Sequence, residues 1–399
     1  VIMNKKIVQL KDEKNSIMPL PVTVSDAVYL ANVGPLREAV GMIPANADVN
    51  GMTLTQFINQ AYGSGGTFTF LHISDTHKFN HGITKCIELM VQDTDIPFTI
   101  ITGDLQLTGE MKSTILASDK PFLLMLGNHD VADDFGGDQI GARNTYIAPF
   151  CEKYVTMGSQ TSSYWYKDVT TSSATIRIIA FDEYEYVTVG SPATSRYSVV
   201  YSQQQIDWFI DLLKSTPPSY YLILAHHQPA SAFRNNGTGK FISEKAPNWY
   251  EHEGALTAIP ELACLPHLLP MILDAYLNGG IVSGEYYCGD TLGTKMTLDV
   301  DFSAISPCKF LFHIGGHTHW DVCEYLPLYP SQLQLIIDED RPAQYVRSDL
   351  PRSEADETAY CINKVMVDFE NKKTVVERIG AHITDSGVDR NVIEYPFVK

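Results

Sequence analysis

No apolar run in the 399-residue sequence approaches the roughly 18–20 residues that a transmembrane helix requires, so we expect no membrane span. A secretory signal is also missing, because polar and charged residues follow Lys5 and Lys6 where a signal peptide has an apolar segment. The seven cysteines are too scattered to form a disulfide framework or a Cys-x-x-Cys metal site, which favours reduced, buried thiols.

Positive charge is scarce: 29 lysines and arginines stand against 47 acidic residues, which gives a net charge of −18. This balance argues against a broad surface for nucleic acids or anionic membranes, since phosphate groups would be repelled on average. A protein of this charge that acts on a phosphorylated substrate needs a local positive centre, and metal ions would supply one. The hydrophobic fraction of 44% is sufficient for a folded core.

Two common hydrolase motifs are absent. The sequence contains no His-Glu-x-x-His, which argues against a metalloprotease of that kind. It also contains no Gly-x-Ser-x-Gly elbow after a predicted strand, which argues against a serine hydrolase. Any catalytic site must therefore rest on other residues.

Residues 1–66 differ from the rest of the chain. Prolines punctuate them, and the stretch Gly63-Ser64-Gly65-Gly66 at their end predicts a flexible joint. We expect a strand over 6–10, a short helix over 52–62, and an N-terminal extension that caps the main domain or attaches it to an assembly partner. The main domain then comprises residues 67–399.

From Thr67 onward, short apolar strands alternate with helices, which predicts an α/β fold with a buried, parallel or mixed sheet. The last three strands are expected to be antiparallel. Two long segments, 131–174 and 230–307, interrupt this alternation as substrate-selecting insertions or lids, the second with a helix around 261–277. The predicted strands span 68–74, 98–102, 122–126, 175–181, 220–225, 310–314, 333–337, 363–370 and 374–379, and the predicted helices span 82–92 and 202–215.

Polar clusters follow five of the apolar strands. In an open α/β sheet the carboxyl ends of the strands line one crevice, so the clusters are expected to converge. Their carboxylate, amide and imidazole groups are ligands for hard and borderline metal ions. A single Gly-Asp or His-x-His is more often a turn or a surface feature, but five such clusters in succession indicate a metal site. The clusters are Asp75-Thr76-His77, Gly103-Asp104, Gly127-Asn128-His129-Asp130, His226-His227-Gln228-Pro229 and Gly315-Gly316-His317-Thr318-His319.

In this order the five clusters resemble the calcineurin-like metallophosphoesterase superfamily, which includes purple acid phosphatases and cyclic-nucleotide phosphodiesterases. The resemblance covers residues 67–382 and implies a four-layer α/β/β/α sandwich with two metal ions at the strand ends. One feature departs from the phosphatase branch, because Leu105-Gln106-Leu107-Thr108-Gly109 follows Asp104 without a second acidic residue. This departure removes no expected metal ligand.

The resemblance also implies a role for individual residues of the clusters. It makes Asp104 the carboxylate that bridges the two ions. His129 corresponds to the acid near the leaving group, with Asp130 as the residue that orients it. The first ion is assigned to Asp75, His77 and His319, and the second to Asn128, His317 and one of the pair His226 and His227.

Either histidine of the pair is compatible with strand alternation, which sends one of the two side chains toward the site without saying which. His227 is favoured as the ligand because His227-Gln228-Pro229 matches the His-x-Pro spacing of the family. His226 would then lie next to the metal ligands without binding a metal ion itself.

The expected function is hydrolysis of a phosphomonoester or phosphodiester by a metal-activated water, with His129 as the general acid. The ligand types suit Mn, Fe and Zn alike, so the identity of the two divalent or trivalent ions stays open. The class of phosphorylated substrate also stays open, because the two insertions would select it.

A second hypothesis makes the chain a non-catalytic binding or structural component built on a phosphoesterase scaffold. The stretches Leu10-Lys11-Asp12 and Pro21-Val22-Thr23 resemble attachment segments of virion-associated and phage tail proteins. This hypothesis implies a virion-associated location, whereas an enzyme is equally compatible with the cytoplasm. No expected ligand is missing, which favours the enzyme.

Overall fold

The computed structural model describes residues 66–185, 201–230, 268–288, 294–319, 321–326, 329–341, 352–381 and 392–397, together with short strands in the remaining segments. The chain divides into two compact units, residues 1–66 with 170–173 and residues 67–169 with 174–399. In the first unit, β1 (Gln9–Lys11) pairs with β2 (Ile17–Pro19), and β3 (Asp48–Val49) pairs with β4 (Met52–Thr53). The role of residues 1–66 as an extension stays a prediction.

A six-stranded sheet forms one half of the larger unit. Its strands follow the order β21 (Val392–Pro396), β20 (Lys373–Gly380), β19 (Cys361–Asp368), β5 (Thr67–Ile73), β6 (Thr99–Ile101) and β7 (Phe122–Leu124). β5, β6 and β7 run parallel, β19 is antiparallel to β5, and β20 is antiparallel to β19. The carboxyl ends of the three parallel strands therefore lie at the same edge.

A seven-stranded sheet forms the other half. Its order is β17 (Val322–Leu326), β18 (Tyr329–Ile336), β16 (Lys309–Gly315), β11 (Tyr221–Ala225), β10 (Thr175–Ala180), β9 (Trp165–Thr170) and β8 (Thr156–Met157). The central strands β18, β16, β11 and β10 run parallel, whereas β17 is antiparallel to β18 and β8 is antiparallel to β9. Two separate hairpins pair β12 (Trp249–His252) with β13 (Ala255–Ala258) and β14 (Ile281–Cys288) with β15 (Thr294–Asp301).

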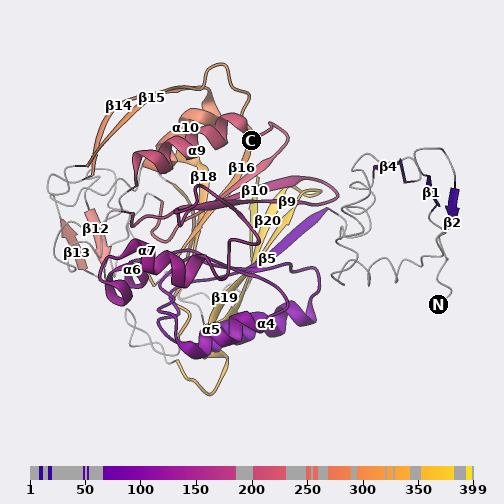
Figure 1. Ribbon diagram of the computed structural model, residues 1–399, viewed down its shortest axis with the longest axis vertical. Coiled ribbons are helices and arrows are strands. Elements are labelled where there is room, and N and C mark those ends of the chain that lie inside the picture. Colours follow the sequence, from indigo (N-terminus) through magenta and orange to yellow (C-terminus); the bar gives the residue numbers. More distant parts are fainter. Residues whose placement is uncertain are drawn as a thin grey trace. The chain divides into compact units, whose positions relative to one another are not determined.

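Helices cover the outer faces of the two sheets. The pair α4 (His81–Gln92) and α5 (Gly109–Leu116) lies on the side opposite α9 (Gln203–Ser215) and α10 (Leu268–Asn278), with the strands between them (Figure 1). Between the sheets, the ring of Phe70 on β5 stacks on that of Phe312 on β16 at a centroid distance of 6.5 Å. A second apolar cluster joins the seven-stranded sheet to α9 and α10. The predicted four-layer α/β/β/α sandwich is therefore confirmed.

Local sequence accounts for the helices that were predicted. α9 begins after Ser202, whose hydroxyl accepts a hydrogen bond from the backbone of Gln205 as an N-cap. Its residues Ile206, Phe209 and Leu213 recur at helical spacing and are buried against the sheet. The shorter helices are α6 (Asn128–Phe135), α7 (Gln139–Ala142), a π-helix at Arg143–Ile147 and a 3-10 helix at Glu357–Ala359.

Several predicted elements differ from the structure. Met52–Thr53 forms strand β4 where a helix was expected over 52–62, and residues 54–62 lie outside the described residues. The strand expected over 333–337 to be antiparallel is antiparallel to β17 but parallel to β16, so its carboxyl end reaches the same edge as those of β11 and β16. The β14–β15 hairpin lies inside the predicted insertion 230–307. Strand β9 lies inside the predicted insertion 131–174 and was not predicted, because the charged residues Lys167 and Asp168 interrupt its apolar pattern.

None of the helices within the described ranges has the length and apolar character to cross a membrane.

Lys120 binds the carbonyl groups that follow the last turn of α4. Its ammonium group donates hydrogen bonds to the carbonyl oxygens of Met90 at 2.8 Å, Asp93 at 3.3 Å, Thr94 at 3.1 Å and Ile96 at 2.6 Å. We predict that Lys120→Met lowers the free energy of unfolding by about 1.5 kcal/mol, because these carbonyls lose a charged donor in a partly buried place. Urea unfolding followed by circular dichroism measures the change.

The matched control is Lys112→Met on the exposed face of α5. This control should change the free energy of unfolding by less than about 0.5 kcal/mol. Equal stabilities for the two variants would contradict the capping role of Lys120.

Candidate metal centre

The five polar clusters come together at one edge of the larger unit. They follow β5, β6 and β7 of the six-stranded sheet and β11 and β16 of the seven-stranded sheet. Backbone hydrogen bonds join neighbouring loops: the N–H of Asp75 donates to Gly103 at 3.0 Å, and that of Gly316 donates to His227 at 2.8 Å. The convergence expected from the strand ends is therefore observed.

A first group of donor atoms consists of Asp75, His77 and His319. The Nε2 atoms of the two histidines are 3.2 Å apart. The Oδ1 atom of Asp75 lies 3.3 Å from Nε2 of His319 and 3.9 Å from Nε2 of His77. All three side chains are largely or completely buried.

A second group consists of Asn128, His227 and His317. The Oδ1 atom of Asn128 lies 3.0 Å from Nδ1 of His317 and 3.1 Å from Nε2 of His227, and these two nitrogens are 3.1 Å apart. Atoms bound to one ion at about 2.0–2.2 Å lie about 3 Å apart when they occupy adjacent positions around it. The spacing in this group fits a single ion.

Asp104 lies between the two groups. Its Oδ2 atom is 3.3 Å from Nε2 of His227. One set of donor atoms within 4.8 Å of one another contains Asp104 with His227 and His317, and another contains Asp104 with His77 and His129. This is the position that a carboxylate shared by two ions would occupy.

Each of the two carboxylates leaves one oxygen available for a cation. The Oδ2 atom of Asp75 accepts a hydrogen bond from the backbone of His317 at 2.8 Å, and the Oδ1 atom of Asp104 accepts one from the backbone of His129 at 2.8 Å. The remaining oxygens, Oδ1 of Asp75 and Oδ2 of Asp104, are buried without a hydrogen-bond donor. Such atoms are costly unless a cation binds them, so the residues present fit a pair of metal ions.

The far nitrogens of three imidazoles face hydrogen-bond acceptors. Nδ1 of His77 lies 3.3 Å from the amide oxygen of Gln106, and Nδ1 of His227 lies 2.7 Å from the carbonyl oxygen of Thr102. Nδ1 of His319 lies 3.2 Å from a carboxylate, described below. An acceptor at Nδ1 requires the hydrogen on that nitrogen, which leaves Nε2 as a lone pair directed at the site.

The electrostatics of the site favour bound positive charge. Burial favours the neutral form of Asp75, but its contacts with His319 hold the pKa of the carboxyl well below the usual range. Burial also raises the pKa of Asp104, but the nearby imidazoles of His227 and His129 lower it by more. The pKa of Asp104 is therefore well below its usual range. Burial alone would lower the pKa of His227, yet the carboxylate of Asp104 raises it to about 10. The site therefore retains a cation, either a proton or a metal ion.

Candidate ligands occupy strained backbone positions. A positive φ in the left-handed region costs about 1–3 kcal/mol outside glycine, and such residues persist where surrounding structure holds them. A Cβ on Gly127 would overlap the carboxylate of Asp104, and one on Gly316 would overlap that of Asp75, so both glycines permit a close approach of neighbouring loops. The strained candidates are Asp75 (φ 54°), His77 (43°), Asp104 (51°), His317 (68°) and His319 (55°).

The two neighbouring histidines of the fourth cluster point in different directions. His227 directs Nε2 at Asn128 and Asp104, as described above. His226 directs Nε2 at Nδ1 of His313, 3.2 Å away, and His313 continues to Gln332 at 2.9 Å. The geometry thus presents His227, and not His226, to the two groups of donors.

His129 stands at the first turn of α6 beside the site, with 14% of its side chain exposed. Its Nε2 lies 3.8 Å from Oδ2 of Asp104, and its Nδ1 lies 2.6 Å from the carboxylate of Asp133. The orienting role expected of Asp130 stays a prediction, since the carboxylate at Nδ1 is that of Asp133. Asp130 instead accepts backbone hydrogen bonds from Gly127 at 2.9 Å and Gln106 at 2.7 Å.

Helix geometry explains the position of Asp133. Asp133 lies four residues after His129, on the same face of α6, whereas Asp130 lies one residue on and turns back to the N–H groups that precede the helix. We predict that Asp133→Asn lowers turnover of a phosphate ester with a poor leaving group about tenfold, the equivalent of one charge-assisted hydrogen bond of about 1.5 kcal/mol. Steady-state kinetics would measure it.

Asp130→Asn provides the contrast to this prediction. Because Asp130 holds the loop of Gln106, which contacts His77, its substitution should weaken metal binding and lower thermal stability. Unchanged kinetics in Asp133→Asn, together with loss of leaving-group dependence in Asp130→Asn, would restore the original prediction.

Two buried carboxylates at the same edge were not predicted. Glu183 follows β10 and accepts hydrogen bonds at 2.7 Å from the N–H groups of both His227 and Gln228. Glu339 follows β18 and contacts His319. The sequence does carry a signal for both, since each comes shortly after an apolar strand, as do the five clusters that were recognised.

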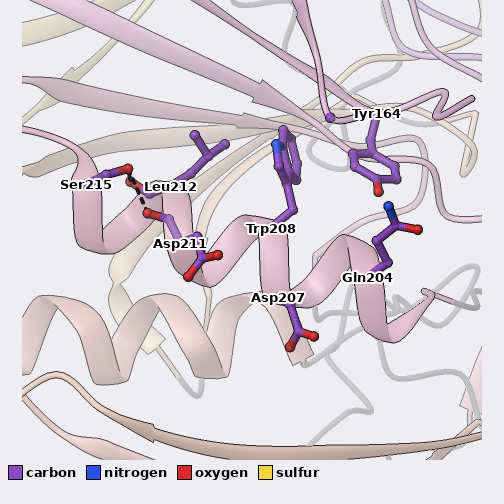
Figure 2. Close-up of a pocket in the computed structure, with 8 residues that line it drawn as sticks. Tyr164, Gln204, Asp207, Trp208, Asp211, Leu212 and Ser215 are labelled. Carbon is purple, nitrogen blue, oxygen red and sulfur yellow. Dashed lines mark hydrogen bonds between the residues drawn. The ribbon is translucent and has the colours of Figure 1, made fainter. Parts of the chain in front are cut away.

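A surface pocket lies apart from these residues. It follows one face of α9, where Trp208 packs against Tyr164 at a ring-centroid distance of 4.7 Å, and Asp207 and Asp211 lie along the same helix (Figure 2). None of the candidate metal ligands lines this pocket.

Several solved structures are similar to this chain. A dimetal phosphatase from Danio rerio is similar in structure at 10% sequence identity over 83% of this chain and 99% of its own, with a TM-score of 0.44. A conserved protein described as a predicted phosphoesterase from Streptococcus pneumoniae aligns at 10% identity over 82% and 97% of the two chains, with a TM-score of 0.29. Vps29 from Chaetomium thermophilum aligns at 10% identity over 83% and 96%, with a TM-score of 0.28.

No curated protein sequence matches the chain. The family model of the calcineurin-like phosphoesterases matches residues 68–259. This match contains the first four polar clusters, and the structure brings the fifth, with His317 and His319, to the same place. Over residues 68–259, the chain is therefore similar to the calcineurin-like phosphoesterase family.

Proposed function

We propose that this protein hydrolyses a phosphomonoester or phosphodiester with the help of two metal ions. One observation carries the proposal: Oδ2 of Asp104 is buried without a hydrogen-bond donor and lies between two groups of candidate ligands. A phosphoesterase family provides a chemical use for such a pair of sites. In a chain with a net charge of −18, the ions would also attract the anionic substrate.

The donor groups suggest which residues hold each ion, with Asp104 shared between the sites. When bound, two such ions neutralise phosphoryl oxygens and lower the pKa of a water between them. The buried ligands keep bulk solvent away from this centre. The first ion is assigned to Asp75, His77 and His319, and the second to Asn128, His227 and His317.

His129 is proposed to protonate the leaving group. The carboxylate of Asp133 lies at Nδ1, so the hydrogen on that nitrogen stays in a hydrogen bond. Nε2 is then the nitrogen that donates its proton to the departing oxygen, and the neutral imidazole remains held by Asp133. The partial exposure of His129 allows a substrate to reach it.

The test uses a generic monoester and a generic diester, p-nitrophenyl phosphate and bis(p-nitrophenyl) phosphate. Protein stripped with a chelator should be inactive with both, and one or more of Mn, Fe and Zn should restore activity toward at least one. The preferred ester then gives the substrate class. Protein that binds metal but hydrolyses neither ester or a wider phosphate panel would support the alternative, a non-catalytic binding component on this scaffold.

A further inference from the structure

Glu339 is a buried carboxylate in contact with the candidate metal centre. It follows strand β18 and is 0% exposed. Its Oε2 atom lies 3.2 Å from Nδ1 of His319, on the side of the imidazole that faces away from Asp75. His319 therefore lies between two carboxylates, with Glu339 at one nitrogen and Asp75 at the other.

Arginines hold this carboxylate in place. Nε of Arg341 lies 2.5 Å from the same Oε2 atom. Arg352 donates hydrogen bonds to the backbone carbonyl of Glu339 at 2.7 Å and to the carboxylate of Asp338 at 2.7 Å. The N–H of Asp340 donates to the carbonyl of Ser74 at 3.0 Å, one residue before Asp75. The segment is thus fixed both to its own sheet and to the end of β5.

A carboxylate in this position selects one form of His319. The oxygen lies 3.2 Å from Nδ1, at ion-pair distance, and its negative charge favours the hydrogen of a neutral imidazole on that nitrogen, which leaves Nε2 free to bind a metal. The imidazole ring is also held at a fixed angle to Asp75. Burying the ion pair of Glu339 and Arg341 costs desolvation free energy. A function for the charge of Glu339 would account for a pair that is retained at this cost.

The other two imidazoles have neutral partners. Nδ1 of His77 faces the amide oxygen of Gln106, and Nδ1 of His227 faces the backbone carbonyl of Thr102. Of these three acceptors, Glu339 is the one with a negative charge, and its contact is with a residue of the first group. Any effect of that charge should therefore fall on one ion more than on the other.

We propose that Glu339 is a positioning residue that sets the affinity of the first metal ion through His319. The inference rests on the proposed two-metal function, but it assigns a role to a residue outside the five clusters. Partners of this kind contribute about 10–100-fold in metal affinity. The proposal requires no contact between Glu339 and substrate.

The experiment is a stepwise metal titration of the full-length protein, stripped with a chelator, by isothermal calorimetry with Mn²⁺. In the wild type we expect two binding events. Glu339→Gln, which keeps an acceptor but loses the charge, should weaken one event about tenfold and leave the other within about threefold. The double substitution Glu339→Ala with Arg341→Met removes carboxylate and arginine together, so no unpaired charge stays buried, and it should weaken the same event more.

Asp338→Asn is the matched control, because Asp338 is equally buried in the same segment and pairs with Arg352 instead of His319. Its two binding events should equal those of the wild type. Equal weakening of both events in the Glu339 variants, or the same loss in Asp338→Asn, would show a structural role and overturn the proposal. Unchanged titrations in both Glu339 variants would also overturn it, whereas a wild type without two events would overturn the proposed function itself.

Discussion

Asp104→Asn is expected to lower kcat at least about a thousandfold, because Asp104 is proposed to hold both ions, which would supply several kcal/mol of charge stabilisation. The substitution keeps the shape of the side chain and an oxygen that accepts from the backbone of His129. It replaces the negative charge at Oδ2, the atom that faces His227 at 3.3 Å. Steady-state kinetics on the preferred ester and metal analysis of the same sample measure the effect.

The control for this substitution is Asp182→Asn. Asp182 is also a buried aspartate after a strand of the sandwich, but its carboxylate accepts from the backbone of Tyr184 and contacts no candidate ligand within the described residues. It should retain most of the activity and both ions. Turnover in Asp104→Asn within about tenfold of the wild type, with two ions bound, would remove Asp104 from the centre.

His129→Ala is expected to lower turnover about 10²–10⁴-fold for an ester with a poor leaving group such as an alkoxide. For a good leaving group such as p-nitrophenolate the loss should be much smaller, because that group departs without a proton. Both ions should remain bound, since the assigned ligands are untouched. A series of aryl and alkyl phosphates of different leaving-group acidity measures this dependence.

The dependence of turnover on the leaving group, together with the number of bound ions, separates two roles for His129. It lies within 4.8 Å of donor atoms of His77 and Asp104, so a role as a metal ligand is the alternative. If His129→Ala loses one ion and loses activity equally for all leaving groups, the acid role is wrong. A steeper dependence on the leaving group with two ions retained supports it.

Much of the fold was predictable because its signals are local. The run Phe122–Leu126 was expected to be a strand and forms β7 over Phe122–Leu124. The helical spacing of Ile206, Phe209 and Leu213 predicted α9. Parallel strands with polar ends then imply a shared site, since their carboxyl ends share an edge.

Other features depend on contacts between distant segments. Alternation along the strand could not choose between His226 and His227, and the choice follows from the contact of His226 with His313, 87 residues away. Asp133 lies at Nδ1 of His129, because α6 begins at Asn128 and Asp130 returns to the backbone of Gly127. Had a helix been predicted to begin at Asn128, the four-residue spacing between His129 and Asp133 would have indicated their contact.

The position of Glu339 depends on the neighbours of its strand. The strand over 333–337 was expected to be antiparallel, and it is antiparallel to β17 but parallel to β16. In the structure β18 runs parallel to β16, so the residues after it reach the same edge as His317 and His319. Nothing in the local pattern of an apolar strand gives its direction relative to a neighbour.

The most direct measurement is anomalous diffraction from crystals of the protein loaded with Mn²⁺ or Zn²⁺. The account predicts two anomalous peaks about 3.5–4 Å apart, with the carboxylate of Asp104 touching both. Asp75, His77 and His319 should surround one peak, and Asn128, His227 and His317 the other. Peaks at other places, or an empty site at saturating metal, would contradict a two-metal centre.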